Sequence, residues 1–195
     1  MPRLVLIVLV FLLALPASAG AQDRPRPEPS LRERIAQMPL DDLFARLAVS
    51  PERTSAKALE NEILRRWYDS GSPTTDLLFG RALQALKDDD QGLALDILDR
   101  VVTLRPAFAE GWNKRATLHF ARDEYGMAMS DLERVLALEP RHFGALAGLG
   151  VILQQFDRKE EALKVFDRAL AINPQMEEVK KVRDELEKEL AGRSL

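Results

Sequence analysis

The chain has 195 residues, of which 46% are hydrophobic and 30% charged, and its formal net charge is −3. This length and balance fit one folded domain. Because acidic side chains outnumber basic ones, the composition argues against nucleic-acid binding and against a polybasic membrane anchor. The sequence contains no cysteine, which excludes disulfides, thiolate chemistry, Cys-ligated metals and a lipoprotein anchor.

Residues 1–21 have the pattern of a secretory signal peptide. Arg3 gives a positive start, residues 4–15 form an unbroken apolar run, and small residues surround two expected cleavage points, after Ala19 and after Ala21. The run is shorter than the roughly 20 residues that span a bilayer, which favours a cleaved signal over a retained anchor. We therefore expect a periplasmic or secreted protein without a membrane span after cleavage.

Two segments follow the signal. Residues 22–38 begin with prolines that alternate with charged residues, and this composition predicts a flexible, extended leader. Residues 39–73 have apolar side chains at helical spacing, and Ser50-Pro51 in their middle is typical of a helix start. Gly71 and Pro73 end the second helix, so this segment is predicted to be a helical hairpin.

A fixed period of 34 governs the next part of the chain. It separates Pro106, Pro140 and Pro174, which end the segments LDRVVTLRP, LERVLALEP and FDRALAINP. Positions that differ by one period form columns, and these keep residue size. Small residues recur at Ala94, Ala128 and Ala162 and at Ala82, Ala116 and Gly150; large ones recur at Leu78, Trp112 and Leu146 and at Leu98, Leu132 and Phe166. Such a period predicts stacked helical hairpins, in which small residues allow helix backbones to approach.

These columns resemble the tetratricopeptide-repeat (TPR) family. The resemblance implies an all-α, right-handed solenoid with repeats at residues 75–108, 109–142 and 143–174. Residues 39–73 fit the register loosely, and we expect them to be a degenerate repeat that caps the stack. The chain is also similar to small secreted proteobacterial TPR proteins, which as a group serve as envelope adaptors.

Residues 175–195 are predicted to form a terminal helix. Its apolar stripe, with charged residues on the opposite side, suits a helix that covers the last open face of the stack. A dimerising helix is the alternative, although only about two heptads are available for it. The protein is accordingly expected to be a monomer or a weak oligomer.

Few residues suggest chemistry. His119 and His142 lie in different repeats, without the spacing of metal ligands. Asp88-Asp89-Asp90 lacks the calcium-loop pattern and is read as a turn between helices. No nucleophile elbow, phosphate-binding loop or zinc-protease motif is present. We expect no enzyme activity, no catalytic or metal site and no cofactor.

Charged pairs also recur in the same register, at Asp99-Arg100, Glu133-Arg134 and Asp167-Arg168. The favoured interpretation is a set of surface ion pairs between repeats, each contributing about 0–1 kcal/mol. The alternative is a charged strip that recognises a partner.

In the TPR family the first helix of each hairpin lines the concave surface. This resemblance places a candidate partner-binding groove at Phe79, Leu83, Leu86, Asn113, Thr117, Phe120, Gly144, Ala147, Val151 and Gln154. The lining is mainly apolar and lacks the basic clamp that some family members use for carboxylates.

Three glycines crowd one helix of the third repeat. Gly150 belongs to a small-residue column, whereas Gly144 and Gly148 are four apart and share a face. They indicate either close helix packing or a shelf for a ligand. The leading hypothesis is an adaptor that binds a peptide segment or helix of a protein partner in the groove, and the alternative is a self-assembling structural module.

Overall fold

The computed structural model describes residues 28–193, which form ten α-helices and no strand. The helices are α1 (Leu31–Gln37), α2 (Leu40–Ala48), α3 (Arg53–Trp67), α4 (Pro73–Lys87), α5 (Gln91–Leu104), α6 (Ala109–Ala121), α7 (Tyr125–Leu138), α8 (Phe143–Gln155), α9 (Lys159–Ile172) and α10 (Glu177–Arg193). The all-α fold class is confirmed. Within the described residues, no helix has the length and apolar character needed to cross a membrane. The predicted signal peptide lies outside the described residues.

The second half of the predicted leader is helical, so the expectation of a flexible segment across residues 22–38 was wrong for α1. Ser30 and Glu33 form a reciprocal capping box at the start of this helix. Ile35, only 5% exposed, packs into the core of the hairpin that follows. The Ser-x-x-Glu spacing was the sequence signal for this helix, because it satisfies two otherwise unpaired backbone N–H groups.

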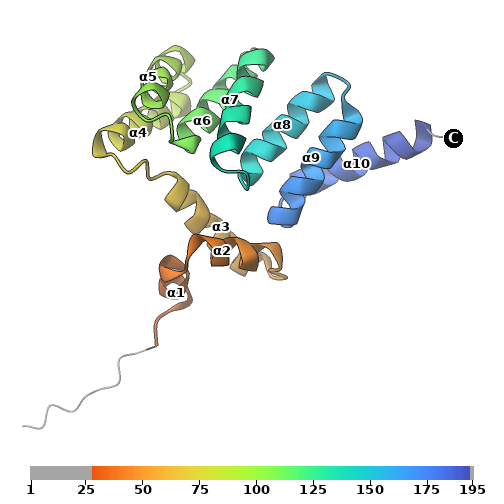
Figure 1. Cartoon of the computed structure of the whole chain (residues 1–195), viewed down its shortest axis with the longest axis horizontal. Helices are drawn as coiled ribbons and strands as arrows, with labels where there is room; N and C mark the ends of the chain where they lie inside the picture. The colour runs from red at the N-terminus through yellow and green to blue at the C-terminus, as the bar shows by residue number, and fades with distance from the viewer. Residues whose placement is uncertain (1–27, 194–195) are drawn as a thin grey trace, which may run out of the picture.

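The sequence period is visible in the backbone. α4–α5, α6–α7 and α8–α9 form three antiparallel hairpins, which stand side by side in an arc (Figure 1). At the turn inside each hairpin one aspartate has a positive φ: 58° at Asp89, 58° at Asp123 and 55° at Asp157. Aspartate tolerates this left-handed conformation better than most residues do. Asp90 then caps α5 by accepting a hydrogen bond from the Leu93 N–H, so the acidic run is a turn.

The small-residue columns hold the helices close together. Ala94, Ala128 and Ala162 are each 0% exposed. A Cβ added at Gly150 would lie 2.4 Å from the Phe166 ring, which leaves room for glycine alone. Close helix packing therefore explains Gly150.

The C-terminal end of the arc is covered by α10. This helix packs on α9, and Leu186, 1% exposed, inserts into the core of the last hairpin. The Arg183 Nε donates to Asp167 Oδ1 at 2.7 Å, so an ion pair joins the two helices. α10 thus takes the place that the first helix of a further repeat would occupy.

The N-terminal hairpin, α2–α3, is helical as predicted, but its expected position was wrong. It does not cover α4 at the start of the stack. Its core instead includes Phe143 of α8 together with Ile172 and Met176, and it lies below the arc in Figure 1, near the lower end of α9. On the solvent-exposed side, Arg141 forms an ion pair at 2.7 Å with Asp41 of α2, which links the hairpin to the residues just before α8.

Charge and stacking explain this position. In the array, Arg115 pairs with Asp99 on the preceding helix. The same sequence offset, counted back from Arg81, falls on Arg65, so a hairpin stacked in register would bring two like charges together. Arg65 binds Glu62 of its own helix instead. Trp67 stacks on His142 with ring centroids 4.1 Å apart and an interplanar angle of 7°, which ties α3 to α8.

Candidate partner-binding groove

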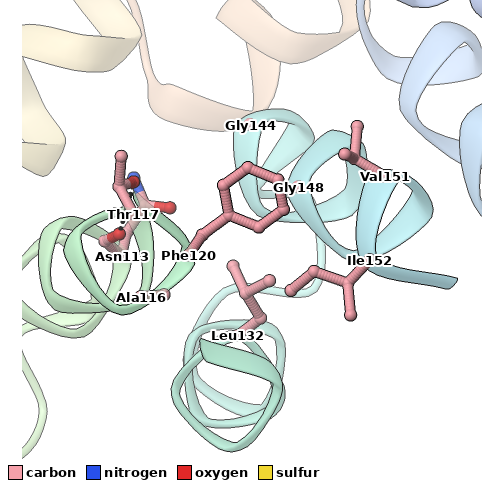
Figure 2. A pocket seen from close by; sticks show the side chains of 9 residues that line it. All are labelled: Asn113, Ala116, Thr117, Phe120, Leu132, Gly144, Gly148, Val151 and Ile152. Carbon is pink, nitrogen blue, oxygen red and sulfur yellow. Dashed lines mark hydrogen bonds between the residues drawn. The ribbon is translucent and has the colours of Figure 1, made fainter. Parts of the chain in front are cut away.

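A pocket of about 160 Å³ opens between α6 and α8, the first helices of the second and third hairpins. Figure 2 shows the side chains around it, with Leu132 of α7 facing the gap between the two helices. The lining is formed by Asn113, Ala116, Thr117, Phe120, Leu132, Gly144, Gly148, Val151 and Ile152. Most of these side chains are apolar, so water in the pocket finds few hydrogen-bond partners.

The aromatic wall of the pocket is Phe120. Its ring extends from α6 toward Gly148 and Val151 on the opposite helix (Figure 2). Tyr125 supports it from behind in an edge-to-face contact, with centroids 5.5 Å apart. The Tyr125 hydroxyl donates to Asp123 Oδ1 at 2.6 Å, which anchors this support to the turn.

The two glycines of α8 that line the pocket are not forced by close packing. A Cβ at Gly148 would lie 3.6 Å from Leu132 Cδ1, and one at Gly144 would lie 3.5 Å from the His142 ring; both are ordinary contacts. Each interior glycine costs a helix roughly 0.8–1 kcal/mol relative to alanine. The absence of two Cβ atoms keeps α8 open to a ligand backbone, which favours the shelf interpretation over close helix packing.

Polar groups at the pocket belong to α6. The Asn113 side-chain amide donates to Glu110 Oε2 at 2.8 Å, and the Thr117 hydroxyl donates to the Asn113 carbonyl at 2.9 Å. The Asn113 Oδ1 accepts no hydrogen bond from the described part of the chain. It is thus placed to accept one from a ligand N–H group.

The link between α3 and α4 packs against α4 and α6 and occupies part of the groove. Tyr68, in the link between α3 and α4, packs edge-on against Phe79 at 5.6 Å, and the Lys114 ammonium lies 5.5 Å from the Tyr68 ring centroid. Farther along the link, the Ser70 N–H donates to Asp76 Oδ1 at 2.9 Å. The open part of the groove is therefore the pocket between α6 and α8.

A buried hydrogen-bond network lies under this link. The Ala145 N–H donates to Nδ1 of His142, so the proton of the neutral imidazole sits on Nε2 and is donated to Glu110 at 2.9 Å. Glu110 and His142 are each 1% exposed. Burial lowers the pKa of Lys114, but the charge of Glu110 and the Tyr68 hydroxyl outweigh it, so that pKa is raised. Lys114 stays charged and paired, and is not free to bind a ligand carboxylate.

Half of the predicted groove residues line the pocket: Asn113, Thr117, Phe120, Gly144 and Val151. Phe79 was wrong as a contact residue, because it is 2% exposed and packs between Tyr68 and Phe108. Leu83 and Leu86 are half-buried against the core of the first hairpin. Ala147 and Gln154 are also half-buried but do not line the pocket.

Four lining residues were missing from the predicted set: Ala116, Leu132, Gly148 and Ile152. Gly148 carried a signal, since it is spaced by four from Gly144. Ala116 and Leu132 lie in columns that read as core, and all three remaining residues are buried although they border the pocket. Among the described residues, no three His, Asp or Glu side chains are grouped to hold a metal ion.

Comparisons with known proteins agree with this architecture. A family model described as a tetratricopeptide repeat matches residues 119–186. A TPR repeat-containing protein of Rhizobium etli (strain ATCC 51251 / DSM 11541 / JCM 21823 / NBRC 15573 / CFN 42) is 37% identical over 153 residues, which cover 78% of this chain and 75% of that protein.

Solved structures show the same fold at lower identity. The Sgt2 TPR domain of Aspergillus fumigatus has a TM-score of 0.58 at 16% identity, covering 63% of this chain and 83% of that one. The first TPR of Spaghetti (RPAP3), bound to the HSP90 peptide SRMEEVD, has a TM-score of 0.57 at 21% identity, and the match covers 60% of this chain and 93% of that one. MamA AMB-1 has a TM-score of 0.53 at 20% identity, and the match covers 77% of this chain and 80% of that one. The chain belongs to the tetratricopeptide-repeat family.

Proposed function

We propose that this protein is a non-enzymatic scaffold that binds a segment of a protein partner in the pocket between α6 and α8. The observation that carries the proposal is an open apolar pocket, faced by two glycines whose missing Cβ atoms are not needed for packing. Exposed apolar hollows of this kind on helical repeats are typical of binding surfaces. The peptide bound to the TPR of Spaghetti (RPAP3) supports a segment as the ligand class.

The size of the pocket limits what enters it. A cavity of about 150 Å³ in another protein holds one benzene molecule, so a pocket of about 160 Å³ has room for one apolar side chain. The ligand backbone would pass over Gly144 and Gly148, with Asn113 Oδ1 accepting a hydrogen bond from one of its N–H groups. An extended segment or one face of an amphipathic helix meets these conditions.

The pocket has no basic residue in its lining, so it differs from a site that binds the carboxylates of acidic chain ends. Lys114, next to Asn113 on α6, is paired with Glu110 at 3.5 Å. Binding in the pocket should therefore depend weakly on salt, because screening acts mainly on exposed charges.

The site of action proposed for this scaffold is the bacterial periplasm or the exterior. The support is the pattern of residues 1–21, with its positive start, apolar run and small residues before Gln22. Mass spectrometry of the mature chain should find an N-terminus between residues 20 and 22. A chain in the envelope fraction that still starts at Met1 would contradict the proposal.

Affinity capture from a cell-envelope extract tests the binding function. The mature protein serves as bait beside Val151→Glu, which places a charge at the pocket, and Gly80→Ala, a control in the column of Gly148 with open space around its Cβ. Partners should bind the parent and the control but not Val151→Glu, once circular dichroism shows equal helicity. Equal capture by all three baits would overturn the pocket as the site.

A further inference from the structure

The end of the array formed by α4 and α5 is not covered by any helix of the described residues. This end face presents Leu77, Leu78, Arg81 and Gln84 of α4 and Leu93 and Leu104 of α5. Leu77, Leu93 and Leu104 are 59%, 49% and 55% exposed. Such a cluster of exposed large apolar side chains is a candidate interaction surface.

The other repeats show what normally covers this face. Leu118, Ile152 and Leu186 occupy the column of Gln84 in the three units that follow, and they are 2%, 1% and 1% exposed. Each belongs to a helix that packs on the second helix of the preceding hairpin: α5, α7 and α9 respectively. In the described part of the chain α4 has no such helix before it, and Gln84 is exposed.

The interior contacts also show which charge the covering helix carries. Arg115 pairs with Asp99 of α5 at 2.8 Å, and Arg183 pairs with Asp167 of α9 at 2.7 Å. Arg81 lies in the same column and is exposed, with no ion pair or side-chain hydrogen bond in the described part of the chain. A helix on this face would therefore place a carboxylate at Arg81.

A groove of about 470 Å³ runs between the two helices of the end face, and Leu78 and Ile97 lie in it beside Arg81 and Arg100. Both arginines are exposed. The acids around the groove are partly engaged, since Asp90 caps α5 and Asp88 accepts hydrogen bonds from the Gln84 amide. The groove therefore combines apolar side chains with two available positive charges.

We propose that the α4–α5 end face binds an amphipathic helix of another protein that presents a carboxylate to Arg81, laid on α4 as α5 is laid on α6. The chain's own hairpin does not fit, because it offers Arg65 at the position of the acid. A second copy is also poorly matched: the apolar stripe of its α10 is engaged with α9, and exposed residues of its α3 include Arg53, Lys57 and Arg65.

The polar Gln84 replaces a buried Leu or Ile of the interior contacts, so the complex should be weaker than a repeat-to-repeat interface and reversible. This surface is separate from the pocket between α6 and α8, and its occupation does not depend on the function proposed for that pocket.

The test uses a helix that already covers the equivalent face elsewhere in the molecule. The probe is a synthetic peptide of residues 159–173, the α9 sequence with Asp167, held helical by a covalent staple on its outer side because short isolated helices are marginal in water. Fluorescence polarisation measures its binding to the mature full-length protein. We expect binding that Arg81→Glu weakens about fivefold to tenfold, through loss of the pair and like-charge repulsion.

A charge swap provides the decisive comparison. A peptide with Asp167→Lys should bind the parent protein weakly and the Arg81→Glu protein more tightly, whereas Arg134→Glu, an exposed arginine of α7, should change neither affinity. No binding at about millimolar protein, or equal affinities for the parent and Arg81→Glu, would overturn the proposal. A dimer seen in sedimentation and abolished by Arg81→Glu would also overturn it, by making the face an interface between copies.

Discussion

The array α4–α10 and the N-terminal hairpin α2–α3 are built from similar helices, yet different forces fix their positions. In the array, each helix meets its neighbour through columns that recur once in every repeat, such as the alanines at 94, 128 and 162. The hairpin is held by contacts that do not repeat: Trp67 on His142, Arg141 on Asp41 and Gln175 on the Ser50 carbonyl.

The hairpin departs from the column pattern at the charge that pairs neighbouring hairpins in the array. Arg65 stands where the array has Asp99 and Asp167, so the hairpin lacks the charge that would hold it against Arg81. The hairpin packs beside α8 and α9 instead, and the first face of the array is left open.

The largest expected effect is the release of the hairpin by Trp67→Ala. The substitution removes the ring that stacks on His142 and contacts Phe143, and truncating a packed Trp costs about 3 kcal/mol. Hydrogen exchange should show faster opening of residues 40–66 while α6 to α9 keep their protection. Trp67→Phe is the control: it keeps a ring and removes an indole N–H that has no hydrogen-bond partner among the described residues. Equal loss of protection along the whole chain would show that hairpin and array are one cooperative unit.

Inside the array, Ala128→Leu should lower the free energy of unfolding by about 1–3 kcal/mol, because Ala128 is 0% exposed and the added atoms overpack paired helices. Urea denaturation measures the change. Ala137→Leu, on the exposed side of the same helix, should be nearly neutral. If both variants unfold alike, the column alignment is wrong.

Acid should weaken the hairpin through Glu62. A hydrogen bond from Arg65, helped by Arg66 against the effect of burial, lowers the pKa of Glu62 to about 2. Because its folded-state pKa lies below the unfolded value, the stabilisation is present above about pH 4.3 and is lost as the pH falls toward 2. Since solvent screens the exposed Arg65 partner, the loss is about 1–2 kcal/mol, less than the full pKa shift implies. Protection factors of the α3 amides, which divide out the intrinsic pH dependence of amide exchange, should therefore fall across this range, and Glu62→Gln should remove most of that fall. An unchanged profile in the variant would assign it to another carboxylate.

The smallest expected effect comes from alanine substitutions of two glycines, and it tests whether Gly148 serves binding. Gly148→Ala and Gly80→Ala should each raise the free energy of unfolding by roughly 0.8–1 kcal/mol, since both add a helix-favouring Cβ without a clash. Gly148→Ala alone should weaken partner binding, because its methyl group occupies the pocket. A stabilised variant that binds less separates binding from folding. Weaker binding by Gly80→Ala as well would extend the site beyond the pocket.

The sequence predicted the array well because periodic columns encode both the helices and their neighbours. Prolines at 106, 140 and 174 marked the repeats, and Gly150 was assigned correctly to close packing. α1 was missed because the proline-rich start of the leader outweighed the Ser30–Glu33 capping signal.

The groove was predicted only in part. Column position placed Phe79 on the concave surface, but Tyr68 and Phe108 cover it, and the path of the α3–α4 link has no periodic signature. Leu132 lies in a core column and is buried, so its column did not indicate that it borders the pocket.

The position of the hairpin is tested most directly by distance measurements between spin labels. The chain has no native cysteine, so two introduced cysteines give one defined label pair. One variant carries spin labels at Ala45 of α2 and Ala171 of α9. The other carries them at Ala45 and at Leu93 of α5, and all three positions are exposed. Packing of α2 on α9 predicts that the 45–171 distance is the shorter of the two. A 45–93 distance shorter than the 45–171 distance would place the hairpin on the α4–α5 end face and contradict the account.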